Sequence, residues 1–116
     1  MFPFRRPSAP EITVAELEQR LKDRSVHLLD VREDWEFLDA HVPGAIHVPL
    51  RELPQRAPGL PKDRPIAVIC ATGHRSLAAA GFLRSHGFEG AASVAGGTKA
   101  WARSGGRLER GPGRAA

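Results

Sequence analysis

Four short apolar runs, separated by segments of a different pattern, place the strongest constraint on how this chain can fold. They cover residues 26–31, 45–48, 66–70 and 91–96. Short runs that lack a regular polar alternation are typical of strands buried on both faces of a parallel sheet. The segments between them carry apolar residues at helical spacing or end at glycine or proline. Strands that alternate with helices in this way predict a layered α/β fold.

Two helices are clearly marked in the sequence. The pattern from Thr13 to Glu16 is a capping box, and it opens a helix that we expect to end near Asp23. The clearest helix follows the third apolar run. We expect it to begin at a cap on Ser76 and to stop at Gly87.

Three shorter helical segments complete the pattern. One follows the first apolar run and groups Trp35, Phe37 and Leu38 on a single face. Another makes at most two turns before Pro54, because proline disfavours helix in the residue before it. The last, after a pair of glycines, is a closing helix that we expect to pack Trp101 inward.

The length of 116 residues allows one domain with a single core. We expect a flexible arm at residues 1–10, the folded domain at residues 11–104 and a flexible Arg/Gly-rich tail at residues 105–116. The formal net charge is +4, and much of the basic excess lies in the two ends. The chain has neither a recognised binding signature nor a basic run interleaved with aromatic residues. We therefore expect no nucleic-acid partner.

Composition also bears on the cellular compartment. No apolar run approaches the ~20 residues that a bilayer-spanning helix needs, so we expect no membrane partner. The early arginines have no apolar stretch behind them, and a secretory signal is not expected. The only cysteine, Cys70, can form neither an intramolecular disulfide nor a zinc site of several thiolates. These features predict a cytoplasmic protein without a metal or other cofactor.

The stretch IAVICATGHRS places Cys70 at the end of the third apolar run, directly before a polar loop. Ligands of parallel α/β sheets bind at the carboxyl ends of strands. Backbone N–H groups of the loop and of the following helix can converge there, and their field favours an anion and a thiolate. Arg75 adds a permanent cation, and Gly73 allows the tight curvature that such a loop needs.

Two interpretations of Cys70 follow. A single cysteine at the end of an apolar strand is often a small buried hydrophobe. A packing cysteine has no use for a glycine-bearing loop that closes on Arg75, so we favour a nucleophile and expect Cys70 to be solvent-accessible and reactive. His74 either orients an anionic substrate or is a solvated loop residue. His41 and His47 lack partners at metal-ligand spacing, and we expect no metal site.

Three blocks of the sequence resemble the signature blocks of single-domain rhodaneses, a family of sulfurtransferases. They are LLDVREDWEFLDAHVPGAIHVP, IAVICATGHRS and VAGGTKAW, in the family's order and at its separations. The resemblance covers roughly Glu11 to Arg103. It implies a rhodanese-like α/β fold in which helices flank a central, five-stranded parallel sheet.

The same resemblance implies a chemistry. Cys70 would take a sulfane sulfur from a small anionic donor such as thiosulfate and hold it as a persulfide. Asp30 and Arg32 would support the site, with Asp30 a structural brace rather than a base. The acceptor would be cyanide in an assay, and a thiol such as glutathione or a reduced redox protein in the cell. The loop residues expected to hold the terminal sulfur or the donor are Ala71, Thr72, Gly73, His74, Arg75 and Ser76.

Two alternatives from other classes remain at this point. Phosphatases and arsenate reductases use a related sheet and loop, but their loop has the spacing Cys-x5-Arg, whereas Cys70 and Arg75 are spaced as Cys-x4-Arg. A non-catalytic rhodanese-like module would bind a partner protein. Such modules typically lack the cysteine, and this chain has both Cys70 and Arg75.

Overall fold

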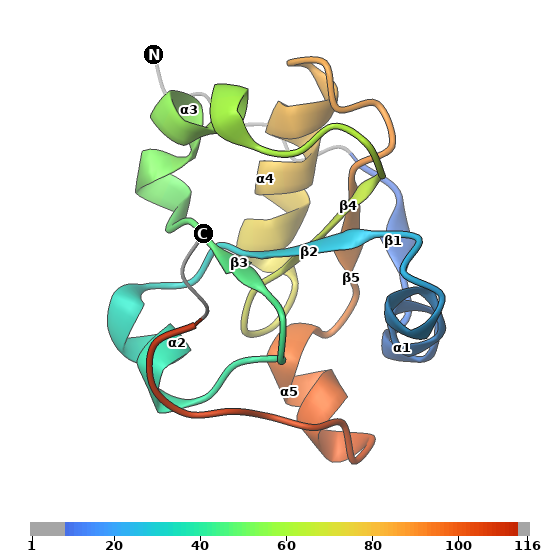
Figure 1. Ribbon diagram of the computed structural model, residues 1–116, viewed down its shortest axis with the longest axis vertical. Coiled ribbons are helices and arrows are strands. Elements are labelled where there is room, and N and C mark those ends of the chain that lie inside the picture. The colour runs from blue at the N-terminus through green and yellow to red at the C-terminus, as the bar shows by residue number, and fades with distance from the viewer. Residues whose placement is uncertain (1–8, 114–116) are drawn as a thin grey trace.

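The computed structural model describes residues 9–113 and contains one sheet of five parallel strands (Figure 1). The strand order is β1-β5-β4-β2-β3, and every neighbouring pair is parallel. The expected α/β fold with a five-stranded parallel sheet is confirmed. The strands are β1 (Glu11–Ile12), β2 (His27–Asp30), β3 (Ile46–His47), β4 (Ile66–Ile69) and β5 (Ala92–Val94).

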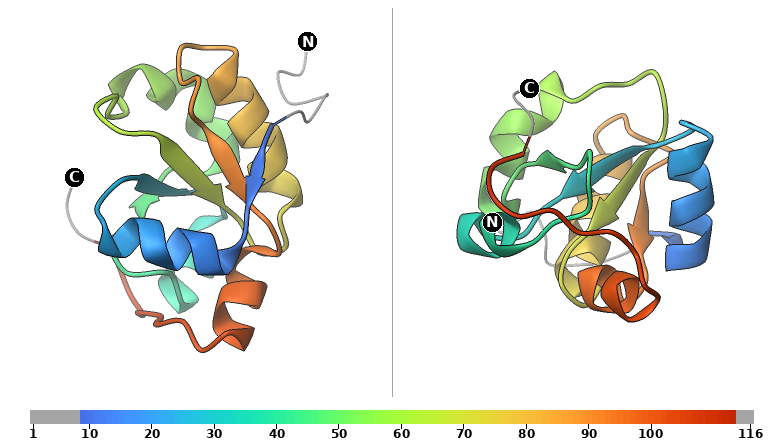
Figure 2. Two further views of the ribbon diagram at one scale, coloured as in Figure 1. Left: turned by 90° about the vertical axis from the view of Figure 1, so that its right-hand side faces the viewer. Right: turned by 60° about the horizontal axis from the view of Figure 1, so that its bottom comes forward.

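Helices cover both faces of the sheet (Figure 2). They are α1 (Val14–Lys22), α2 (Asp34–Asp39), α3 (Leu53–Arg56), α4 (His74–Arg84) and α5 (Gly97–Arg103), with 3-10 turns at Leu50–Glu52 and Ala57–Gly59. Successive side chains of a strand point to opposite faces of the sheet, so alternate strand residues pack in two different apolar clusters. Leu29 packs in a cluster with residues of α3 and α4, whereas Leu28 packs with residues of α1 and α5.

The short helix α2 differs from its predicted packing. Phe37 is buried, whereas Trp35 is 71% exposed and Leu38 is 47% exposed. The Phe37 ring is stacked on the rings of His41 and His47, at centroid distances of 3.8 and 4.3 Å. A helix of six residues therefore presents only one large apolar side chain to the core, and the single apolar face expected from the sequence is wrong.

The helix after Cys70 begins three residues earlier than predicted. Gly73 is the residue that caps α4, with a left-handed φ of 109°, and Ser76 lies inside the first turn rather than at the cap. The helix ends at Arg84, before Gly87. The left-handed turn at Gly73 lets the chain reverse tightly after Cys70, which only glycine does without strain.

The helical segment near Pro54 also extends further than predicted. Pro54 lies in the first turn of α3, and helical turns continue from Leu50 to Gly59. Proline is tolerated there because the first N–H groups of a helix have no intrahelical partner.

The segment after α5 packs on the domain, which corrects the prediction of a free tail for residues 105–113. The Trp101 Nε1–H donates to the Arg107 carbonyl at 2.8 Å. His41 and Glu109 exchange two backbone hydrogen bonds of 2.8 Å each, and the Gly111 N–H donates to Leu38 at 2.7 Å. The rest of the predicted arm and tail, at residues 1–8 and 114–116, lies outside the described residues.

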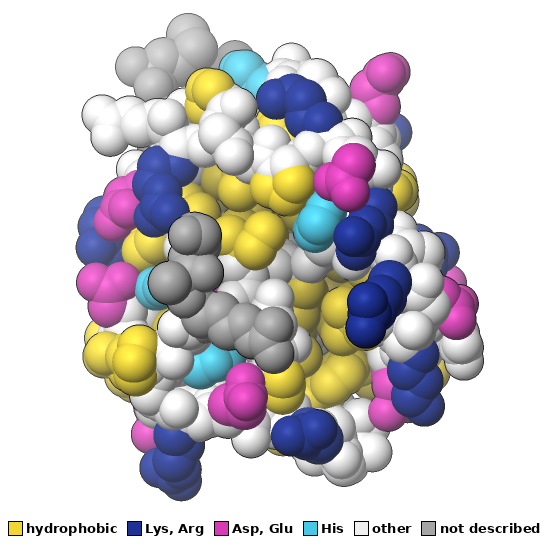
Figure 3. Space-filling view, viewed as in Figure 1, with side chains coloured by type: hydrophobic (Ala, Val, Ile, Leu, Met, Phe, Trp, Pro, Cys, Tyr) yellow, Lys and Arg dark blue, Asp and Glu magenta, His cyan; other side chains and the backbone are white. Residues whose placement is uncertain are grey.

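Charged side chains are mixed on the face of the molecule shown in Figure 3. Lys and Arg side chains are spread around its rim, with Asp and Glu side chains among them. This face therefore presents no continuous basic stripe. Within residues 9–113, no helix is both long enough and apolar enough to span a bilayer.

Candidate active site

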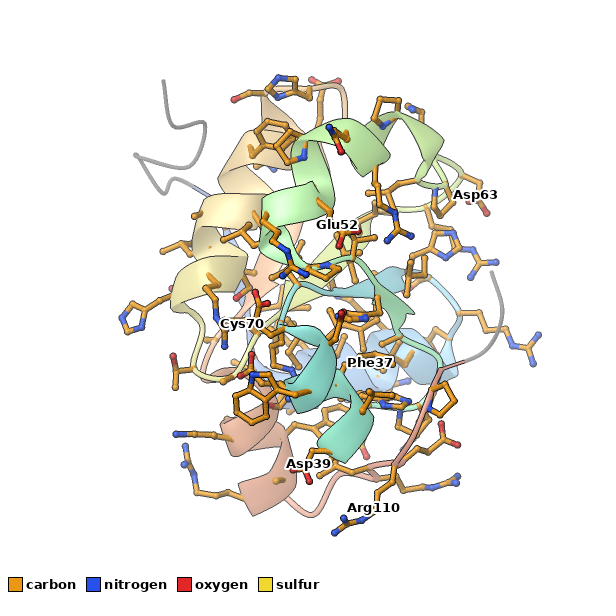
Figure 4. All side chains as sticks on the ribbon, turned by 90° about the vertical axis from the view of Figure 1, so that its left-hand side faces the viewer. Phe37, Asp39, Glu52, Asp63, Cys70 and Arg110 are labelled. Carbon is orange, nitrogen blue, oxygen red and sulfur yellow. The ribbon has the colours of Figure 1, made fainter. Side chains whose placement is uncertain are left out.

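Cys70 directly follows β4, where the loop begins that leads to α4 (Figure 4). Its Sγ accepts hydrogen bonds from the backbone N–H groups of Gly73 at 3.1 Å and Ser76 at 3.3 Å. The loop therefore wraps around the sulfur, as the sequence pattern predicts. N–H groups that point at one atom stabilise negative charge there, and the N-terminus of α4 adds its dipole.

Two serine hydroxyls lie behind the sulfur. The Cys70 thiol donates to Ser76 Oγ at 3.4 Å, and Ser76 Oγ also donates to the Gly73 carbonyl at 3.2 Å. Ser93 on β5 completes the group, with its Oγ 2.8 Å from that of Ser76. Both serines are fully buried. Ser76 thus has a structural position inside the site, whereas Ser93 was not predicted to take part.

The expected accessibility of Cys70 is wrong, because the residue is only 1% exposed. The loop encloses the sulfur, and α5 lies against the loop from the other side. The Thr98 N–H donates to the Cys70 carbonyl at 2.8 Å, and the Lys99 N–H donates to Ala71 at 3.2 Å. Cys70 is therefore both a core residue and the centre of a polar loop, so burial alone does not separate the two interpretations.

Gly97 makes the close contact between α5 and the loop possible. It has a φ of 59°, and a Cβ atom built on it would lie 2.2 Å from the Cys70 carbonyl oxygen. No side chain larger than hydrogen fits there without moving the backbone. The sequence marks Gly97 only as a break before the closing helix, so its role in supporting the loop was missed.

Arg75 does not point freely toward a ligand, because it pairs with Glu36 of α2. Its Nη1 and Nη2 donate to the two carboxylate oxygens at 2.8 and 3.0 Å. The pair raises the pKa of Arg75 and lowers that of Glu36, with the side-chain hydrogen bonds between them as the main cause. Glu36 was not predicted. No signal in the sequence distinguishes it from Glu33 or Asp34 at the same helix start.

A family model described as the rhodanese-like domain matches residues 13–104. The chain belongs to the rhodanese-like domain family. This confirms the family that the three sequence blocks resemble. A solved rhodanese-related protein from Thermoplasma volcanium has the same fold, with a TM-score of 0.80, 34% identity, and coverage of 86% of this chain and 97% of that one.

Two curated relatives have names that refer to carrying or transferring sulfur. The putative sulfur carrier protein YrkF of Bacillus subtilis is 39% identical over 81% of this chain. This chain spans only 51% of the length of that relative. The thiosulfate sulfurtransferase GlpE of Tolumonas auensis is 36% identical over 78% of this chain and 85% of its own.

Asp30 and Arg32 of this rhodanese-like domain bind each other at the end of β2. The Arg32 Nε donates to both Asp30 oxygens at 3.1 Å, and Nη2 donates to Oδ2 at 2.9 Å. Arg32 Nη2 also donates to the Ala40 carbonyl at 2.7 Å, which ties the end of α2 to β2. Both side chains are nearly inaccessible. This geometry supports a brace for the segment that carries Glu36.

We expect Asp30→Asn to lower the free energy of unfolding by about 3 kcal/mol, because it leaves the buried Arg32 guanidinium without its carboxylate. Urea denaturation measures the change. The matched control is Asp39→Asn. The Asp39 carboxylate is 73% exposed and lies 3.9 Å from Arg110. Exposed ion pairs of this kind contribute little to the free energy of unfolding. Equal stability of the two variants would show that the Asp30 pair is not a brace.

The histidines lie in different environments within this rhodanese-like domain. His74 is exposed at the start of α4, with its Nδ1 3.3 Å from Thr72 Oγ1. His41 and His47 flank Phe37, and their ring nitrogens contact the backbone oxygens of Phe37 and Arg32 at 2.8 Å. Within the described part of the chain, no three His, Cys, Asp or Glu side chains come together as a metal site.

Proposed function

We propose that the protein is a sulfurtransferase that carries a sulfane sulfur as a persulfide on Cys70, with thiosulfate as one donor. The observation that supports this most is the pair of N–H groups, from Gly73 and Ser76, aimed at the Cys70 sulfur. Relatives named as a sulfur carrier and as a thiosulfate sulfurtransferase support the same class of reaction.

In the loading step, the Cys70 thiolate attacks the outer sulfur of thiosulfate. A new S–S bond forms, the S–S bond of thiosulfate breaks, and its electron pair leaves with sulfite. The persulfide that remains is anionic. N–H groups of the loop stabilise that charge in the same way as they stabilise the thiolate.

In the unloading step, an acceptor attacks the outer sulfur of the persulfide and restores the Cys70 thiolate. Cyanide becomes thiocyanate in this step, and a thiol becomes a persulfide. The acceptor comes from outside, so a single cysteine is sufficient. Glutathione or a reduced redox protein is the acceptor that we propose for the cell, and a reduced cytoplasm is the compartment that would keep the lone thiol active.

Access to the sulfur requires a local movement, because Cys70 is almost completely covered. Thr72 in the loop and His74 at the start of α4 are exposed. A displacement of their side chains or of the loop backbone would let a donor approach Sγ. Exposed loops open at lower cost than strands and helices, so β4 and α4 can stay in place.

The proposed function is tested by steady-state transfer of sulfur from thiosulfate to cyanide. We expect formation of thiocyanate that saturates with thiosulfate and that depends on enzyme concentration. No thiocyanate above the uncatalysed rate, with thiosulfate, methanethiosulfonate or an organic persulfide as donor, would overturn the proposal.

We expect Arg75→Ala to lower kcat/KM for thiosulfate about 10²-fold. The change removes a cation beside the loop and leaves the Glu36 carboxylate unpaired. Arg75→Lys should retain part of the activity, since it keeps the charge but not the planar fork. Arg110→Ala, which removes an exposed arginine from another part of the chain, is the control. Near-normal kcat/KM in Arg75→Ala would mean that backbone N–H groups alone bind the donor.

A further inference from the structure

The cation of the active loop already has an anionic partner. Arg75 uses both terminal nitrogens to hold the Glu36 carboxylate end-on, at 2.8 and 3.0 Å. The other charged pair at this edge is Asp30 and Arg32, whose side chains also bind each other. These four side chains carry no net charge together. A sulfur donor therefore meets a nearly neutral set of side chains and not an unpaired arginine.

The Glu36 carboxylate is fixed more firmly than the Arg75 guanidinium. Its Oε1 also accepts a hydrogen bond from the Glu33 N–H at 3.0 Å, as part of the capping box of α2. The Glu36 side chain is 14% exposed, whereas that of Arg75 is 35% exposed. A donor anion that binds the guanidinium must therefore compete with a carboxylate that is held in place by its own helix.

We propose that Glu36 is a specificity-determining residue that weakens the binding of doubly charged sulfur donors relative to donors of lower charge. This inference rests on the sulfur transfer through Cys70 proposed above. Glu36 acts through Arg75, since it occupies the two N–H groups that a sulfonate group would otherwise take. Its negative charge also opposes the approach of a dianion more than that of a monoanion.

Two donors of the same shape allow a direct comparison. Thiosulfate carries two negative charges, and methanethiosulfonate replaces one charged oxygen with a methyl group. With the second donor, the Cys70 thiolate again takes the outer sulfur, the S–S bond breaks and methanesulfinate leaves with the electron pair. The reaction at sulfur is unchanged, so the ratio of the two kcat/KM values measures the preference of the site for a dianionic over a monoanionic donor.

Four proteins complete the experiment: wild type, Glu36→Gln, Arg75→Ala and the double variant. We expect Glu36→Gln to raise the thiosulfate-to-methanethiosulfonate ratio of kcat/KM by about 5- to 10-fold, mainly through a lower KM for thiosulfate. In the Arg75→Ala background, the same change removes an unpaired negative charge but no competition for a guanidinium, so at high salt, which screens the charge, the increase should be smaller than in the protein that keeps Arg75. A larger or equal increase there would contradict a role through Arg75.

The matched control is Asp39→Asn, which removes one carboxylate from the other end of α2 (Figure 4). We expect Asp39→Asn to leave the ratio unchanged. An equal rise of the ratio in Asp39→Asn and Glu36→Gln would show that the effect comes from the net charge of the protein and not from the position of Glu36. A ratio that falls or stays constant in Glu36→Gln would overturn the proposal and assign Glu36 a purely structural role.

A binding measurement separates this inference from the proposed reaction. Calorimetry with thiosulfate on Cys70→Ser, with and without Glu36→Gln, needs no turnover. We expect Glu36→Gln to lower the Kd for thiosulfate about 5- to 10-fold. An unchanged or higher Kd would overturn the role of Glu36, even if wild type transfers sulfur. Conversely, a lower Kd with no turnover in wild type would leave Glu36 as an anion-selectivity residue and reject the sulfurtransferase reaction.

Discussion

Replacing Cys70 with serine is expected to lower sulfur transfer from thiosulfate to cyanide at least ~10³-fold, because the hydroxyl is a far weaker nucleophile at neutral pH. The fold should remain intact. Serine is close in size to cysteine, and its Oγ can accept the N–H groups of Gly73 and Ser76 that now contact the sulfur. Thiocyanate formation measures the rate, and circular dichroism with urea denaturation checks the fold.

Cys70→Ala is the companion variant, since it removes the nucleophile and leaves no hydroxyl in its place. We expect the same loss of activity in both. Turnover within tenfold of wild type in either variant would place the reacting sulfur elsewhere and refute the mechanism.

Replacing Gly97 with alanine is expected to lower the free energy of unfolding by about 3 to 5 kcal/mol and to remove most of the activity. The new Cβ would lie 2.2 Å from the Cys70 carbonyl oxygen and 2.6 Å from the backbone of Ala71. These are backbone atoms, which cannot rotate away. The start of α5 would have to move, and the hydrogen bonds of Thr98 and Lys99 to the loop would be lost.

Gly105→Ala controls for the cost of the backbone conformation. Gly105 has a φ of 85°, but a Cβ atom there would meet nothing within 4 Å. We expect it to cost about 1 kcal/mol, as a left-handed alanine does, and to leave the activity unchanged. If Gly97→Ala were no worse than Gly105→Ala, the close packing of α5 on the loop would not matter for the site.

The sheet could be predicted because a strand that is buried on both faces has apolar residues at consecutive positions. The strand β4 is buried at all four positions and reads as a continuous apolar run. The two-residue strand β1 has no such run, because Glu11 is exposed and only Ile12 is buried. Trp35 was misplaced for the opposite reason: it is apolar but lies on the exposed side of a helix of six residues.

The loop around Cys70 could be predicted because its residues are consecutive, but the partners of the loop could not. Glu36 reaches Arg75 from a position 39 residues away, and this pairing depends on how α2 lies against the end of β2. Ser93 and Gly97 reach the loop from β5 and α5 in the same way. Such contacts are set by tertiary packing, which a local pattern does not encode.

The persulfide on Cys70 is the central claim, and intact-protein mass spectrometry after incubation with thiosulfate tests it most directly. We predict that wild type gains the mass of one sulfur atom, that a thiol reductant or cyanide removes it, and that peptide mapping places it on Cys70. Cys70→Ser should gain nothing under the same conditions. A wild-type mass that stays unchanged after incubation with thiosulfate, or an equal gain by Cys70→Ser, would contradict the account.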